Sequence, residues 1–94
     1  MAKLNKDLLV QMLETMLKIR MFEEKVIELE KRKELPGWLH FYIGEEAVAT
    51  GVCANLKKED FICSTHRGHG HLIAKGADMK YMMAELYDKK TGYC

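Results

Sequence analysis

One long helical pattern near the amino terminus constrains the fold of this 94-residue chain more than any other feature. From Asn5 to about Lys33, apolar residues recur at the spacings of three and four that place them on one face of a helix. Asn5 is a suitable N-cap, and Asp7 complements the positive end of the helix dipole. The apolar positions of this face are Leu9, Met12, Leu13, Met16, Ile19, Val26 and Leu29.

This predicted helix would be about 40 Å long, which is more than the rest of the chain can easily cover. A chain of this size buries only about 60–65% of its unfolded surface, so its core is small. We therefore expect part of the apolar face to stay exposed on the isolated chain. The face serves either the intramolecular core or a contact with another subunit, and the pattern alone leaves both open.

The rest of the sequence predicts short elements separated by clear breaks, which begin with Pro36 and Gly37. The short apolar run at 61–65, which follows a polar turn, is suited to a buried strand. Because this predicted strand follows a predicted helix, the order of elements indicates an α/β unit within a single domain. Asp78 is a candidate N-cap for the last helix, whose methionines we interpret as core filler. The predicted elements are a loop or extended segment at 38–43, a helix at 45–56, a turn at 57–60, a strand at 61–65, and helices at 71–75 and 78–87.

Charge and composition exclude several classes of function. The 15 basic and 14 acidic side chains are interleaved, so there is no basic patch of the kind that binds nucleic acid. The apolar runs are far shorter than the roughly 20 residues of a membrane-spanning helix, and the first residues lack the apolar core of a signal peptide. We therefore expect a cytoplasmic protein. Its three cysteines, Cys53, Cys63 and Cys94, are predicted to be reduced thiols in the core.

The segment from Ser64 to His71 is the strongest candidate for chemistry, because it follows the predicted strand and contains three histidines, two glycines and Arg67. Ligands of α/β folds bind at the carboxyl ends of strands, and glycines allow the backbone to approach them. The Arg67 guanidinium suits phosphate or carboxylate. The pattern therefore predicts an anion site, while a solvated turn with incidental histidines remains the alternative.

Three closely spaced histidines also raise the hypothesis of zinc. No cysteine or carboxylate nearby completes a set of four ligands, so we expect no metal site in this loop. Imidazoles beside an anion site are instead suited to proton transfer near neutral pH. His40 is a further candidate for the same site, although its position in the sequence does not place it there.

Several ordered motifs resemble the α-subunit of thiamine-diphosphate-dependent dehydrogenases over nearly the whole chain. The resemblance is greatest to the acetoin dehydrogenase branch, and the pyruvate and branched-chain 2-oxo-acid dehydrogenases are also similar. The motifs are Met16-Leu-Lys-Ile-Arg-Met-Phe-Glu23, His40-x-Tyr-x-Gly-Glu-Glu-Ala47, Asp60-x-Ile-x-Ser-Thr-His-Arg-Gly-His-Gly-His71, Ala74-Lys-Gly76 and Met82-Met-Ala-Glu-Leu86.

This resemblance implies a doubly wound parallel α/β fold, of which the chain would be a mostly helical amino-terminal piece with about one strand. It also implies thiamine diphosphate with magnesium, an α2β2 assembly, and acyl transfer to a lipoyl-bearing acyltransferase. By motif, His66 and Arg67 fall where the family contacts the diphosphate, and His66 stands where relatives often have Tyr. His40 and His69 fall where the family lines the reactive end of the cofactor, so the resemblance assigns them to proton handling and substrate contact.

The sequence departs from the family pattern in two places. Glu45 stands where many relatives have Gln, a change that the family tolerates. The motif that holds magnesium, a Gly-Asp-Gly followed some thirty residues later by Asn, is not among residues 1–94. We therefore expect residues 1–94 to be an incomplete domain, a fragment of an α-subunit that is inactive by itself and whose donor is pyruvate, acetoin or another 2-oxo acid. A small autonomous anion-binding or regulatory module, or a histidine-loop metal protein, is the alternative.

Overall fold

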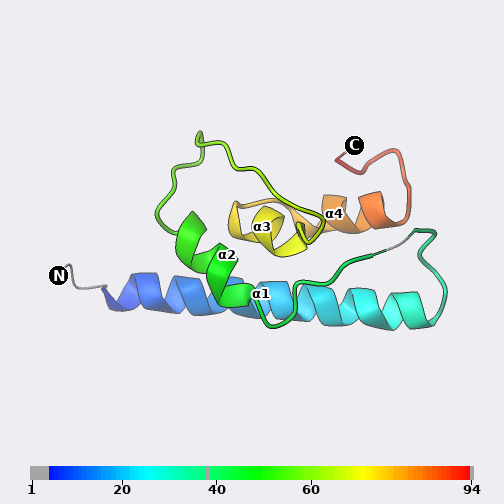
Figure 1. Cartoon of the computed structure of the whole chain (residues 1–94), viewed down its shortest axis with the longest axis horizontal. Coiled ribbons are helices and arrows are strands. Elements are labelled where there is room, and N and C mark those ends of the chain that lie inside the picture. The colour runs from blue at the N-terminus through cyan, green and yellow to red at the C-terminus, as the bar shows by residue number, and fades with distance from the viewer. Residues whose placement is uncertain (1–4, 38, 94) are drawn as a thin grey trace.

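The computed structural model describes residues 5–37 and 39–93, and within these ranges the regular structure is helical (Figure 1). The longest helix runs the length of a molecule that measures 47 × 25 × 20 Å, and the shorter helices all lie on one side of it. The helices are α1 (Lys6–Lys31), α2 (Glu46–Cys53), α3 (His69–Ala74) and α4 (Met79–Leu86). The prediction of a mostly helical piece is confirmed.

Helix α1 begins as its sequence predicts, because the Asn5 side chain accepts a hydrogen bond from the Leu8 backbone N–H at 2.6 Å. It ends at Lys31, slightly before the predicted boundary. The reason is that Lys33 has a φ of 58°, in the left-handed region. The N–H of Glu34 then donates to the carbonyl of Leu29 at 3.1 Å, which closes the last turn.

The carboxyl-terminal half of α1 supplies the centre of the core. Ile19 and Val26 are fully buried, and buried residues from every other helix and from the loop after α1 belong to the same core cluster. The core cluster consists of Ile19, Phe22, Val26, Leu29, Leu35, Tyr42, Ala49, Ile73 and Met82. This burial of one apolar face, rather than helix propensity, is the main source of stability for helices of six to eight residues such as α2, α3 and α4.

Helix α1 keeps a row of large apolar side chains exposed, of which Leu9 and Leu13 belong to the predicted apolar face, whereas Met12 and Met16 of that face are half-buried. The large apolar residues that remain at least about half exposed on α1 are Leu9, Val10, Leu13, Leu17 and Met21. Helix α2 lies beside the amino-terminal half of α1, and only the first turns of α1 extend beyond the other helices, as Figure 1 shows. The expectation that this helix is longer than its cover is therefore confirmed.

The predicted bounds of the short helices are close to those in the structure. Helix α3 begins at His69 rather than His71, because the turn that starts it follows Gly68, and it ends before Gly76, which has a φ of 102°. Asp78 caps α4 as predicted, accepting from the Lys80 N–H at 2.9 Å. Met82 is buried, and Met79 and Met83 pack against the same core. The interpretation of these methionines as core residues is confirmed.

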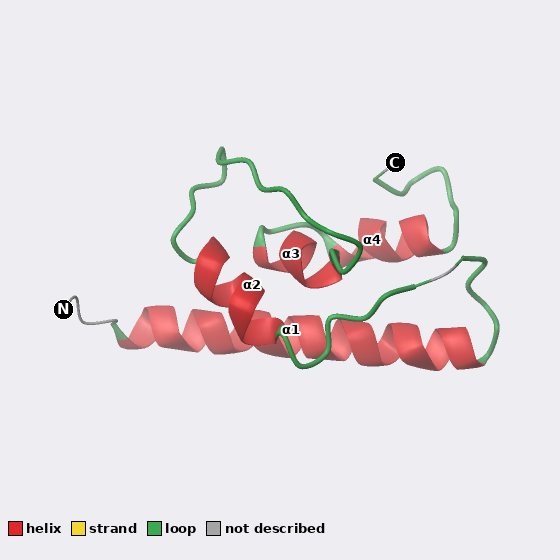
Figure 2. Cartoon of the chain, in the orientation of Figure 1, coloured by secondary structure: helices red, strands yellow, loops and turns green. Residues whose placement is uncertain are grey.

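The predicted strand at residues 61–65 is wrong. This segment is loop, as Figure 2 shows for the whole connection between α2 and α3, and the Phe61 side chain is 99% exposed. A strand requires hydrogen bonds to a neighbouring strand, and the described residues provide none beside it. The helix-and-strand unit expected from the sequence is therefore not formed by residues 5–37 and 39–93.

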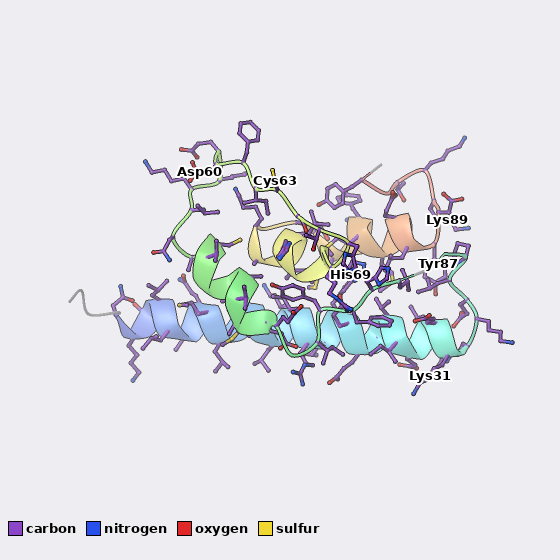
Figure 3. The ribbon with its side chains drawn as sticks, viewed as in Figure 1. Lys31, Asp60, Cys63, His69, Tyr87 and Lys89 are labelled. Carbon is purple, nitrogen blue, oxygen red and sulfur yellow. The ribbon has the colours of Figure 1, made fainter. Side chains whose placement is uncertain are left out.

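The cysteines differ partly from prediction. Cys53 and Cys63 are free thiols, as expected. Cys53 is half-buried, and burial raises the pKa of its thiol. Cys63 is exposed on the loop after α2 (Figure 3), so its assignment to the core is wrong. Cys63 lies in the segment 61–65, which forms a loop instead of the predicted buried strand. Cys94 and Trp38 lie outside the described residues. None of the described helices has the length and apolar character needed to cross a membrane.

Candidate functional site

The loop before α3 lies against the loop between α1 and α2. The Arg67 guanidinium donates a hydrogen bond to the backbone carbonyl of Phe41 at 2.8 Å, across 26 residues of sequence. The imidazole rings of His40 and His66 meet edge to face, with 4.6 Å between their centroids. The structure therefore brings together His40, His66 and Arg67. His40 is the residue that the sequence alone could not place at this site.

His69 is the first residue of α3 and points toward α1. Its Nδ1 lies 2.5 Å from Oε1 of Glu23, and its ring meets the edge of Phe22 at a centroid distance of 5.7 Å. Glu23 is fully buried, and its other carboxylate oxygen accepts from the Tyr42 backbone N–H at 3.4 Å. Figure 3 shows His69 in the space between α3 and α1. Glu23 thus connects His69 with the loop that carries His40.

The last histidine of the predicted segment has different partners. Nδ1 of His71 lies 2.5 Å from the Ser64 hydroxyl, and its ring packs against the ring of Tyr42 at 5.0 Å. Burial raises the pKa of the Tyr42 phenol above its ordinary value. Gly70 lies directly against this ring, since an added Cβ would be 2.2 Å from Tyr42 Cδ2. Gly70 is therefore required for packing against Tyr42, whereas the sequence suggested approach to a ligand.

These contacts do not favour the zinc hypothesis. His66 packs on His40, His69 pairs with Glu23 and His71 pairs with Ser64, so the imidazoles of the segment turn toward separate partners. Within the described ranges, no three His, Cys, Asp or Glu side chains gather as a metal site would require.

An ion pair at the start of α2 holds this helix and the preceding loop on α1. Arg20 Nε donates to Glu46 Oε2 at 2.6 Å, and Nη2 donates to Oε1 at 3.2 Å. The Gly44 N–H also lies within 3.0 and 3.1 Å of the two carboxylate oxygens. The hydrogen bond from Arg20 is the main cause that lowers the pKa of the Glu46 carboxyl to about 2, and the same bond raises the pKa of Arg20.

Comparison with known proteins decides which family this arrangement belongs to. Residues 14–94 match the family described as the dehydrogenase E1 component. The chain belongs to this family. The resemblance inferred from its motifs is therefore confirmed, and an autonomous module of another class is not favoured.

The similar proteins are α-subunits of dehydrogenases. The chain is 60% identical over 83 residues to the α-subunit of acetoin:2,6-dichlorophenolindophenol oxidoreductase from Bacillus subtilis, covering 88% of the chain and 25% of the relative. The corresponding subunit from Cupriavidus necator is 47% identical over 91 residues, covering 97% of the chain and 27% of the relative. The α-subunit of the pyruvate dehydrogenase E1 component from Porphyra purpurea is 40% identical over 89 residues, covering 95% of the chain and 26% of the relative.

The chain thus spans about a quarter of the length of the curated relatives that it matches. No solved structure gives a significant match. The geometry of the site in this E1 family member therefore comes from the chain's own contacts.

Sequence reasoning missed Glu23 and the pair formed by Arg20 and Glu46. A signal for Glu23 was present, since it lies four residues after Ile19 and three before Val26, at a position where the apolar face of α1 predicts a buried residue. A buried carboxylate at such a position needs a hydrogen-bonding partner. Its partner His69 is 46 residues away, so the pairing itself depends on the tertiary structure.

Proposed function

We propose that this chain contributes one side of the cofactor site in the α-subunit of a thiamine-diphosphate-dependent dehydrogenase that acts on acetoin or pyruvate. The observation that carries the proposal is the meeting of His40, His66 and Arg67 at one exposed place in a chain of the E1 family. The names of the similar α-subunits support acetoin or pyruvate as the donor. The doubly wound α/β fold expected of the complete domain belongs to the same proposal.

The side chains at this place fit the diphosphate of the cofactor. Arg67 is exposed, and only one of its guanidinium nitrogens is engaged by the Phe41 carbonyl, which orients the group and leaves further donors for an anion. His66 lies beside it on His40 and adds a second donor. We assign diphosphate contacts to Arg67 and His66.

Magnesium calls for carboxylate and carbonyl oxygens, and the described part of the chain contains no suitable cluster of side chains. We therefore assign the magnesium ligands to protein outside this chain. When bound, thiamine diphosphate supplies the carbanion that attacks the substrate carbonyl. The chain's own residues bind and orient the cofactor, and His40 and His69 handle protons and contact the substrate.

The proposal includes the partners of the complete enzyme: the rest of the α-subunit, a β-subunit in an α2β2 assembly, and a lipoyl-bearing acyltransferase. It also includes the expectation that the chain alone has no turnover. Each charge-assisted hydrogen bond contributes only about 1.5–3 kcal/mol net, and a closed, preorganised site needs the remaining polypeptide.

A segment exchange tests the proposal. The 83 matched residues of the Bacillus subtilis α-subunit would be replaced by those of this chain, to which they are 60% identical, and the hybrid would be assembled with its partner subunit. We expect acetoin-dependent reduction of 2,6-dichlorophenolindophenol. Arg67→Gln should weaken thiamine diphosphate binding about 10–100-fold, because it removes a charged donor.

Arg32→Gln is the matched control, because Arg32 is an exposed arginine at the end of α1 that pairs with Glu28. It should leave cofactor binding unchanged. A hybrid without turnover would contradict the proposed function, and equal effects of Arg67→Gln and Arg32→Gln would contradict the assignment of Arg67.

A further inference from the structure

Glu23 is a fully buried carboxylate whose two oxygens face two different donors. Oε1 lies 2.5 Å from His69 Nδ1, and Oε2 lies 3.4 Å from the backbone nitrogen of Tyr42. An unpaired carboxylate in the core would be costly, so both contacts matter for its burial. Glu23 joins three parts of the molecule: α1, the start of α3 and the loop between α1 and α2.

The contact with Glu23 decides which nitrogen of His69 carries the proton. An ionised carboxylate only accepts hydrogen bonds, so Nδ1 of His69 must be the donor. In a neutral imidazole this places the single proton on Nδ1 and leaves Nε2 as an acceptor. Phe22 holds the ring from the side, and the side chain of His69 keeps 17% of its surface exposed, so the imidazole remains accessible to a ligand.

We infer that Glu23 is a positioning residue that holds His69 in the tautomer with Nδ1 protonated and Nε2 free to accept a proton. This inference rests on the proposed function for the role of His69 in proton transfer. The arrangement of a carboxylate that orients an imidazole recurs in enzymes of unrelated folds, but here it follows from the contacts of Glu23 alone.

Glu23→Gln separates this role from simple packing, because glutamine has the same shape but carries one acceptor and one donor. The Tyr42 backbone N–H can only donate, so the amide oxygen must face it. The amide NH₂ then faces Nδ1 of His69, which must become the acceptor. The variant should therefore move the proton of His69 from Nδ1 to Nε2, whereas a residue that acted only by filling space would leave the tautomer unchanged.

Long-range proton–nitrogen NMR correlation on the ¹⁵N-labelled chain reports the tautomer directly, and His69→Gln assigns its signals. At a pH where the imidazole is neutral, we expect the Nδ1–H form in the wild type and the Nε2–H form in Glu23→Gln. Glu24→Gln is the matched control, because Glu24 is the exposed neighbour on the same helix, and it should keep the wild-type tautomer. An Nε2–H tautomer in the wild type would overturn the inference even where Glu23→Gln does not fold.

Turnover tests the consequence in the hybrid enzyme. Glu23→Gln should lower kcat at least about tenfold, as expected when a proton-transferring group has the wrong form, with KM changed about twofold or less. A shifted tautomer with normal kcat would overturn the role in turnover. A wild-type hybrid without activity would instead contradict the proposed function, and the NMR result would still decide the assignment of Glu23.

Discussion

At the scale of single residues, the contact between Arg20 and Glu46 is the clearest electrostatic determinant of the fold. The guanidinium presents two nitrogens to the two carboxylate oxygens, and the Gly44 N–H adds a third donor. Arg20 is 44% exposed at its side chain while Glu46 is only 10% exposed. The carboxylate therefore depends on these donors more than the arginine depends on the carboxylate.

This contact predicts a specific loss of stability in acid. The pKa of Glu46 in the folded chain is about 2, below its ordinary value of 4.5, so the stabilisation is complete above pH 4.5 and is lost as the pH falls toward 2. Glu46→Gln should lower the free energy of unfolding by about 1–2 kcal/mol near neutral pH, a modest value because solvent screens the half-exposed Arg20. Urea unfolding followed by circular dichroism should show this difference shrinking below pH 4.5.

Glu59→Gln is the control for that measurement, because Glu59 is exposed and has no ion-pair partner among the described residues. It should unfold like the wild type at every pH. A difference for Glu46→Gln that stays constant from pH 7 to about 2.5 would show that the ion pair does not contribute as described.

Much of the candidate site could be predicted from residue types, but its connections could not. The glycines and charges of residues 64–71 marked the segment that contains His66, Arg67 and His69. The contacts of His40 with His66 and of Glu23 with His69 join residues 26 and 46 positions apart. Such pairs depend on how α1, α3 and the intervening loop pack, and periodicity within one element carries no information about them.

At the scale of elements, α3 is placed by the absence of a side chain at Gly70. The Tyr42 ring is buried against this glycine, and Tyr42 also belongs to the central core. The close approach brings α3 near α1, where His69 reaches Glu23. The position of His69 therefore depends on a packing contact made by the next residue.

Gly70→Ala should destabilise the chain by about 1–3 kcal/mol, because the added methyl group would lie 2.2 Å from Tyr42 Cδ2 and either the ring or α3 must shift. Gly51→Ala is the matched control. Gly51 is a glycine of α2 with nothing within 4 Å of an added Cβ, so alanine there should be neutral or stabilise by up to about 1 kcal/mol. Chemical unfolding of the two variants should separate them, and equal stabilities would contradict the packing role of Gly70.

Elements stabilised by local contacts were predictable, whereas the predicted strand was not formed. Asn5 and Asp78 act as N-caps through backbone groups two or three residues away, so their helices could be located from sequence. Residues 61–65 have an apolar composition suited to a strand, but a strand exists only where a neighbour pairs with it. Within the described ranges Phe61 has no such neighbour and is almost completely exposed.

At the scale of the whole molecule, the first turns of α1 extend beyond the other helices, and α1 presents an exposed apolar face to solvent that consists of Leu9, Val10, Leu13, Leu17 and Met21. A surface hollow of about 330 Å³ continues this face toward α2 and is lined by Leu13, Met16, Leu17 and Ala47, together with the polar contact of Arg20 and Glu46. Contiguous apolar surface of this kind is unfavourable in water and favours association.

We predict that the isolated chain self-associates through this face. Leu17 is 52% exposed among the exposed apolar residues of α1, and glutamine is a good helix former that would replace its apolar surface without weakening α1. Leu17→Gln should therefore shift sedimentation equilibrium toward monomer and reduce the binding of a hydrophobic dye.

Leu72→Gln is the matched control, since Leu72 is 44% exposed but lies on α3, away from the face. Because removing one scattered apolar residue does not break a contiguous patch, Leu72→Gln should associate like the wild type. A wild-type chain that sediments as a monomer at all concentrations and binds no dye would show that the apolar face of α1 does not drive association.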